Sequence, residues 1–399
     1  MADTIVKSYR YRIYLSKKQQ SLIKVQFRLM NNLYNACLEQ RILNYKHIHP
    51  KFTSKYDQIN ELVELKEAFP EYKSIHSQVL QNVIDRVDKA FKNYFIRIKK
   101  NKTSKVKTKV GFPRYKPYKE YKSFTFPQTG YEILDKDNGK KKLRVSKVGE
   151  MKLKLHRPIG GKIKECTLKK AKTNKWYATF VCECVPKRLP ILDKITAFDL
   201  GVKHFITFSD GSKIDNPHFL KHETKELKKA QQKLSKTEKK SKEREERKKV
   251  VARVHERINN KKEDFLQKES RKIVNENGLI IYEKLNIKRM IEDNNQKEVG
   301  SEYNKSISEI SWGIFTKYVS DKAEEAGREV EKVNPKDTSR MCSNCFNIRD
   351  ITLDVRIYEC VNEKCRFVID RDKNAALNIL RLGIESHNKK VNNVNLTSY

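Results

Sequence analysis

Four closely spaced cysteines late in the chain constrain its fold more than any other feature. Cys342 and Cys345 form one pair, and after fourteen further residues Cys360 and Cys365 form another. Two close pairs of thiolates suit one tetrahedral zinc ion, with each pair on a tight turn and the middle segment forming a hairpin. The second pair is more widely spaced than is common, and the glycines often found at such turns are missing. We therefore predict a structural Zn²⁺ site, and no additional ligand or base suggests catalysis there.

The other cysteines have a different sequence context. Cys182 and Cys184 fall on the apolar positions of an alternating strand pattern, so we expect both to be small core residues, as we do Cys37 and Cys166. The chain starts with strand-like sequence and has no recognisable export signal. The thiols are therefore expected to be reduced, in a cytosolic compartment.

A short apolar strand, residues 195–201, contains one acidic residue, Asp199. A carboxylate inside an apolar strand is costly to bury unless a cation compensates its charge. The next run, through Phe208, has the pattern of a hairpin partner. This arrangement resembles the first strand of an RNase H-type nuclease core. A strand that simply ends in an Asp-Leu-Gly turn would look the same, so the interpretation depends on acidic partners for Asp199.

Two later segments supply such partners. Residues 278–283 form an apolar run long enough for one buried strand, which ends in Glu283. Asp372 lies where a helix begins, although capping alone would explain an aspartate there. Three carboxylates from three elements can bracket two divalent ions about 3.5–4 Å apart. Oxygen-only ligands favour Mg²⁺ or Mn²⁺, so Asp199, Glu283 and Asp372 are the candidate metal ligands and catalytic residues.

The charge of the chain favours a polyanionic partner. Lysine and arginine number 87 against 50 aspartates and glutamates, a formal net charge of +37 that is spread along the sequence. No segment approaches the ~18 apolar residues that a membrane span needs, so no membrane partner is expected. Aromatic and basic residues alternate over 111–127, which suits nucleic-acid binding, although alternating aromatics are more often core.

The periodicity before residue 195 predicts a strand, a helical insertion and then a β-rich segment. Alternation over 9–15 predicts a strand, and Ser16 is placed to cap the helix that follows. A second long helix is expected over 74–99, and a barrel-forming set of strands over 130–190. The lysine-rich stretch 99–109 is either a solvated linker or a phosphate-facing loop. From 195 onward, strands alternate with helices, which is typical of an α/β layer.

Several motifs together resemble the TnpB family of transposon-encoded RNA-guided nucleases, relatives of type V CRISPR effectors. The most specific are the four cysteines followed by Asp370-Arg371-Asp372-Lys373-Asn374-Ala375-Ala376. Further matching motifs are Gly111-Phe112-Pro113-Arg114-Tyr115, Lys175-Trp176-Tyr177-Ala178, Phe198-Asp199-Leu200-Gly201, His255-Glu256-Arg257-Ile258, Glu283-Lys284-Leu285-Asn286, Asn334-Pro335 and Thr338-Ser339. The resemblance covers nearly the whole chain, and Asp199, Glu283 and Asp372 match the family's catalytic positions.

The resemblance implies a multidomain α+β fold. It comprises a β-barrel wedge domain, a helical recognition lobe, a RuvC-like α/β nuclease domain with an inserted zinc ribbon, and a disordered tail. The corresponding ranges are 1–16 with 111–190, 17–110, 191–337 with 370–383, 338–369, and 384–399. The implied activity is Mg²⁺-dependent cleavage of double-stranded DNA that pairs with a guide RNA next to a short adjacent motif.

Two alternatives remain open. A nuclease-inactive relative would be an RNA-guided DNA-binding regulator, but such a protein would normally have lost one of the three carboxylates. A strand-transferring transposase would use the same metal chemistry, although a zinc ribbon between the last two acids, a barrel and a recognition lobe argue against it.

Overall fold

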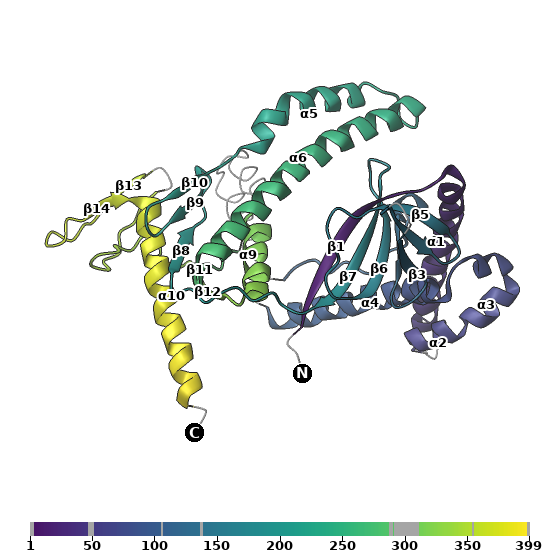
Figure 1. The fold of residues 1–399 in the computed structure, drawn as a ribbon, viewed down its shortest axis with the longest axis horizontal. Coiled ribbons are helices and arrows are strands. Elements are labelled where there is room, and N and C mark those ends of the chain that lie inside the picture. Colours follow the sequence, from purple (N-terminus) through teal and green to yellow (C-terminus); the bar gives the residue numbers. More distant parts are fainter. Residues whose placement is uncertain are drawn as a thin grey trace. The chain divides into compact units, whose positions relative to one another are not determined.

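The computed structural model describes residues 4–46, 52–104, 107–135, 139–286, 290, 311–352 and 355–396, except for the side chains of 220–222 and 393–396. The chain divides into two compact units, Met1–Val185 and Pro186–Tyr399 (Figure 1). Each unit has its own hydrophobic core. Within the described residues, no helix is long and apolar enough to cross a membrane.

The first unit is built on a curled antiparallel sheet of seven strands. In chain order these are β1 (Ile5–Tyr14), β2 (Ser123–Phe126), β3 (Tyr131–Asp135), β4 (Lys141–Val145), β5 (Gly149–Lys154), β6 (Lys162–Lys170) and β7 (Trp176–Cys184). Their order across the sheet is β2-β6-β7-β1-β5-β4-β3, so β2 and β3 are its edges. The ring centroids of Phe126 on β2 and Tyr131 on β3 lie 6.4 Å apart. The sheet therefore curls enough for its edge side chains to meet.

Alternation determines which face of this sheet is buried. On β7, Trp176, Ala178, Phe180, Cys182 and Cys184 are all buried, as predicted, because every second residue of a strand points to the same side. Cys37 and Cys166 are buried too. Burial raises the pKa of Cys166 well above its usual range and that of Cys182 to about 11. These four cysteines are core residues, as expected from the sequence.

Two long helices pack on the buried face of the sheet, and shorter helices adjoin them. They are α1 (Lys17–Lys46), α2 (Lys55–Asn60), α3 (Leu62–Ala68), the 3-10 turn η1 (Pro70–Ser74), α4 (Ser77–Thr103) and the 3-10 turn η2 (Tyr118–Glu120). Ser16 caps α1 as predicted, since its hydroxyl accepts from the Gln19 backbone N–H at 3.2 Å. The stretch 99–109 is helical as far as Thr103, so its first half is neither a linker nor a loop.

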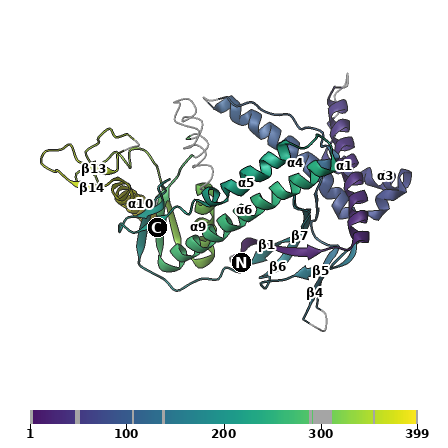
Figure 2. The same cartoon turned by 90° about the horizontal axis from the view of Figure 1, so that it is seen from above.

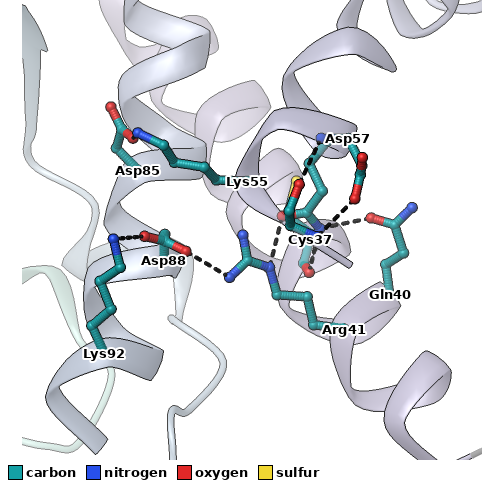
Figure 3. Close-up of polar contacts among 10 residues, drawn as sticks. Cys37, Gln40, Arg41, Lys55, Asp57, Asp85, Asp88 and Lys92 are labelled. Carbon is teal, nitrogen blue, oxygen red and sulfur yellow. Dashed lines mark hydrogen bonds and ion pairs between the residues drawn. The ribbon is translucent and has the colours of Figure 1, made fainter. Parts of the chain in front are cut away.

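A polar network joins α1, α2 and α4 (Figure 3). Arg41 on α1 donates to Gln58 at 2.9 Å and to Asp88 at 3.2 Å, and Gln58 donates to the carbonyl of Cys37 at 2.8 Å. Lys55 pairs with Asp85 at 3.2 Å. Because Gln58 is buried, its hydrogen bonds offset the cost of desolvating its amide and fix the register of the three helices.

The second unit is a three-layer α/β arrangement. Its strands are β8 (Ile195–Asp199), β9 (His204–Phe208), β10 (Lys213–Asp215), β11 (Leu279–Glu283) and β12 (Glu329–Val333), in the order β10-β9-β8-β11-β12. On one face, Phe198 and Tyr282 pack with Phe315 of α9 (Trp312–Ala326) and with α6 (Lys242–Glu276). On the other, Ala197 and Ile281 pack with Ile379 of α10 (Arg371–Leu396). Figure 1 shows α10 opposite α6 and α9.

Helices α5 (Phe219–Ser235) and α6 run side by side as a helical hairpin (Figures 1 and 2). Ser241 caps α6, accepting from the Arg244 backbone N–H at 3.1 Å. Glu223 of α5, which is buried, pairs with Arg257 at 2.6 Å and Lys261 at 2.7 Å of α6. Gly327 ends α9 in the left-handed conformation that glycine tolerates best.

Residues 384–396 do not form the disordered tail that was expected, because α10 continues to Leu396. Gly383 is required by packing: a Cβ there would lie 2.2 Å from Cγ2 of Ile281. Beyond it, Ser386 and Lys390 bind the buried carboxylate of Glu331 on β12 at 2.7 and 2.6 Å. These contacts hold the second half of the helix on the sheet.

Candidate functional site

The sheet of the second unit brings Asp199 and Glu283 together. β8 and β11 are parallel neighbours, paired from Leu279 with Ile195 to Tyr282 with Phe198. The next residues along are Glu283 and Asp199, so the two acids end adjacent strands at the same edge. Both strands were predicted from their apolar runs. The hairpin after Asp199 also formed as expected, since Asp199 pairs with Thr207 of β9.

The carboxyl groups of both acids ionise less readily than usual. Burial, together with the negative charge of Asp372, raises the pKa of Asp199 to about 7. Burial and the charge of Asp199 raise the pKa of Glu283 to about 8, although a hydrogen bond from Thr338 opposes this. Glu283 is only 9% exposed. Like charges this close disfavour ionisation, and a cation would reverse the effect.

Helix α10 supplies the third acid, and the structure corrects the assignment of its cap. Asp370, not Asp372, caps the helix: its Oδ1 accepts from the backbone N–H groups of Asp372 and Lys373, each at 3.0 Å. Asp370 also pairs with Lys213 at 2.8 Å. Asp372 lies one residue inside the helix, where its Oδ1 is 3.4 Å from Arg371. Its carboxylate therefore does not cap the helix, and its negative charge raises the pKa of Asp199.

Two features of this site were not predicted from the sequence. Thr338, 2% exposed, donates its hydroxyl proton to Oε1 of Glu283. Asn374 and Asn378, both fully buried on α10, donate to the backbone of the segment that follows Thr338. The local signals were the Thr338-Ser339 motif and the spacing of the two asparagines, one helical turn apart on the same face.

The four cysteines come together as predicted. Their sulfur atoms all lie within 4.8 Å of one another. Cys342 Sγ is 3.9 Å from Cys365 Sγ, and Cys345 Sγ is 3.4 Å from Cys360 Sγ. Four sulfurs at this spacing, from two pairs, make a cluster that could hold zinc.

The two hairpins of the cluster lie elsewhere than expected. Each encloses one cysteine pair: Met341 bridges to Ile348 around the first, and β13 (Ile357–Glu359) pairs with β14 (Val368–Asp370) around the second. The middle segment does not itself form the hairpin within the described residues. Phe346 and Arg366 lie directly after the two pairs, where glycine is often found, and take left-handed conformations with φ of 65° and 46°. Such conformations cost a non-glycine residue about 1–2 kcal/mol.

Among the described residues, the four cysteines are the one group of histidine, cysteine or acidic ligand atoms that fits within 4.8 Å. The carboxylate oxygens of Asp199, Glu283 and Asp372 therefore do not all lie within 4.8 Å of one another. The charge of Asp372 acts on Asp199 and that of Asp199 acts on Glu283, and both interactions raise the pKa of the affected acid.

The exposed face of the first unit's sheet carries arginines stacked on tyrosines. Arg10 lies 5.2 Å and Arg12 5.4 Å from the ring centroid of Tyr177, and Arg12 is also 5.3 Å from that of Tyr14. Lys152 lies 5.6 Å from the Tyr14 ring. Within the parts of the chain that the structure describes, neither arginine pairs with a carboxylate. Stacked guanidinium groups keep their donors fixed and available.

The fold and these two clusters define a class of protein: a multidomain α+β chain with an acidic site on an α/β sheet and a four-cysteine cluster beside it. Three family models match. OrfB_IS605, described as "Probable transposase", matches residues 180–294, and "Cas12f1-like, TNB domain" matches 312–379. A "Helix-turn-helix domain" model of the same OrfB_IS605 group matches 1–49, where the described residues form β1 and the single helix α1.

Curated relatives match over most of the chain. A Streptomyces pristinaespiralis protein, provisionally named an RNA-guided DNA endonuclease, is 27% identical over 96% of this chain and 91% of its own length. TnpB-like protein L79 of Acanthamoeba polyphaga mimivirus is 25% identical over 95% of this chain and 74% of its own. A solved mini-RNA-guided endonuclease, CRISPR-Cas_phi3, has a TM-score of 0.51 at 10% identity, covering 96% and 93% of the two chains, which indicates a shared fold. The chain is thus similar to the TnpB family over most of its length.

Proposed function

We propose that the chain is an RNA-guided DNA endonuclease of an insertion sequence. It would cleave double-stranded DNA that pairs with a guide RNA beside a short adjacent motif. The observation that carries the proposal is the convergence of Asp199, Glu283 and Asp372 from β8, β11 and the first turn of α10. Such an arrangement suits metal-dependent hydrolysis of a phosphodiester in a RuvC-like site.

The residues of this site fit divalent metal ions. They offer only oxygen donors, which suits Mg²⁺ or Mn²⁺. The raised pKa values of Asp199 and Glu283 reflect negative charges that lack a cation. Asp199, Glu283 and Asp372 would hold the ions, and the metal would supply water activation and stabilisation of the leaving oxygen. An oxygen set broader than 4.8 Å is compatible with ligands divided between two ions.

This chain's own residues would prepare the site for that chemistry. Asp370 caps α10, so Asp372 is free to face the sheet. Thr338 donates to Glu283 and thereby orients one carboxylate oxygen. Gly201 permits the close turn after Asp199, since a Cβ there would lie 2.8 Å from the carbonyl oxygen of His204. Each contact holds an acid or its strand in a fixed position before substrate arrives.

The proposed partners are a guide RNA and double-stranded target DNA. The names of the relatives motivate this, and the chain's formal net charge of +37 suits a long polyanion. Arg10 and Arg12, held on tyrosine rings, are candidate phosphate contacts. A phosphate-binding arginine that is already ordered loses less conformational entropy on binding.

We also propose the domain assignment that the family implies. The curled sheet would be the wedge domain, comprising 1–16 and 111–190, and the helices of 17–110 the recognition lobe. The nuclease domain would comprise 191–337 and α10 from 370, and residues 338–369 a structural zinc ribbon held by Cys342, Cys345, Cys360 and Cys365.

A guided cleavage assay tests the proposal. The full chain is purified with its co-purifying RNA, the RNA is sequenced, and matching DNA is offered with Mg²⁺. We expect cleavage with wild-type protein and none with Asp199→Ala, Glu283→Ala or Asp372→Ala, while a gel shift shows retained DNA binding. Guided binding without cleavage by the wild type would instead favour the regulator, and strand transfer would favour the transposase. Absence of a bound RNA of defined length would refute the proposal.

A further inference from the structure

Among the residues that the structure describes, the Glu283 carboxylate has one hydrogen-bond partner, the hydroxyl of Thr338. Glu283 is 9% exposed and Thr338 2% exposed, so water competes little for this bond. The same hydroxyl lies 3.2 Å from the Pro335 carbonyl oxygen, but it has one proton and the Glu283 contact is the shorter. When a cation ionises Glu283, the hydrogen bond to its carboxylate is also the stronger of the two.

Thr338 is itself held in place by α10. The side-chain amide of Asn378 donates to the Thr338 carbonyl at 2.9 Å and to the Met341 carbonyl at 2.7 Å. Asn374 donates to the same Met341 carbonyl at 2.7 Å and accepts from the Ser343 backbone N–H at 2.9 Å. The strand end that bears Glu283 and the helix that bears Asp372 are thus joined through residues 338–343.

We propose that Thr338 is a positioning residue of the acidic site, which fixes the Glu283 carboxylate for metal binding, and that Asn378 fixes Thr338. This inference rests on the proposed function of the site. Partners that hydrogen-bond a metal ligand commonly change metal affinity or activity by about 10–100-fold when removed. A ligand set spread over three elements depends strongly on such orientation, because a displacement of about 0.5 Å matters.

The test compares Thr338→Val with Thr338→Ser in the full chain. Valine keeps the shape and loses the donor, whereas serine keeps the donor and loses the methyl group. Mn²⁺ binding is measured by calorimetry, which needs neither guide RNA nor DNA, and zinc content and circular dichroism report folding. We expect Thr338→Val to weaken Mn²⁺ binding about 10–100-fold, with Thr338→Ser close to wild type. In a Glu283→Ala background, Thr338→Val should cause no further loss.

Several results would overturn the inference. One is wild-type Mn²⁺ affinity in Thr338→Val, and another is an equal loss in valine and serine variants, which would indicate packing of the methyl group. If Thr338→Val and Thr338→Ala both fail to fold while Thr338→Ser folds, the hydroxyl has a structural role instead. A wild-type chain that binds no Mn²⁺ would overturn both proposals, whereas one that binds Mn²⁺ but never cleaves guided DNA refutes the proposed function alone.

Discussion

Replacing Asp370 or Asp372 should separate stability from catalysis, although the two acids are two residues apart. Asp370 accepts two backbone hydrogen bonds at 3.0 Å as the cap of α10 and pairs with Lys213 at 2.8 Å. Loss of a cap costs about 0.5–2 kcal/mol. The ion pair adds little, since Asp370 and Lys213 are 43% and 28% exposed and surface pairs contribute about 0–1 kcal/mol.

Asp370→Ala should therefore lower the stability of the second unit by about 1–2 kcal/mol. For a unit of this size, that corresponds to a fall in Tm of roughly 3–6 °C. Asp370→Ser restores a capping oxygen and should recover most of this loss. Both variants should still cleave guided DNA at a temperature where they remain folded, because Asp370 contacts neither Asp199 nor Glu283.

Asp372→Ala should give the opposite result. It leaves the cap intact, and its loss from the first helical turn costs about 0.3–1 kcal/mol, partly offset by relief of repulsion with Asp199. Cleavage should fall to background, since removing a ligand sacrifices several kcal/mol of transition-state stabilisation. Thermal melts and guided cleavage with Mg²⁺, run on all three variants, measure both effects. Cleavage by Asp372→Ala, or its loss in folded Asp370→Ala, would refute the assignment.

Three further outcomes are expected. Cys342→Ser should lower zinc content and folded yield more than it lowers the cleavage rate of the folded fraction. Elemental analysis and the cleavage assay measure these effects, and Cys37→Ser is the control for a buried cysteine outside the cluster. Replacing Arg10 and Arg12 by glutamine should reduce the salt dependence of nucleic-acid binding by up to about 0.7–0.9 per lost phosphate contact; Arg144→Gln, which removes a cation already paired with Glu132 and Glu150, should change it little. Because the folded-state pKa values of Asp199 and Glu283 are raised to about 7 and 8, their contribution is fully present below pH 4 and is lost as pH rises towards 8. Melts of metal-free protein should show this decline, and added Mg²⁺ or the Asp199→Asn variant should reduce it.

Elements whose pattern is local were predicted well. Two strands formed where the sequence indicated, the alternating strand Trp176–Cys184 and the apolar strand Leu279–Glu283. In each, the order of apolar residues along the chain shows directly which side chains are buried. The cysteine cluster formed as well, since the spacing of the pairs nearly determines its geometry.

Elements that depend on tertiary packing were predicted poorly. Gly383 looked like a helix end, yet it lies inside α10, where Ile281 occupies the space that a side chain would need. Lys390 and Ser386 then find a buried acceptor in Glu331, a strand residue far away in sequence. A polar segment without apolar periodicity gives no sign of such partners, so local patterns underestimate its order.

The acidic site shows why residue types alone did not fix residue roles. Either aspartate of the Asp370-Arg371-Asp372 sequence satisfies the pattern of a helix cap, and the choice depends on how β14 leads into α10. Had Asp372 been the cap, its oxygens would be occupied by backbone N–H groups and less able to bind a cation. Because Asp370 makes those bonds, Asp372 lies close enough to Asp199 to raise its pKa, a repulsion that destabilises the metal-free fold. The chain thus assigns helix stability to one acid and leaves the other available for ligand binding.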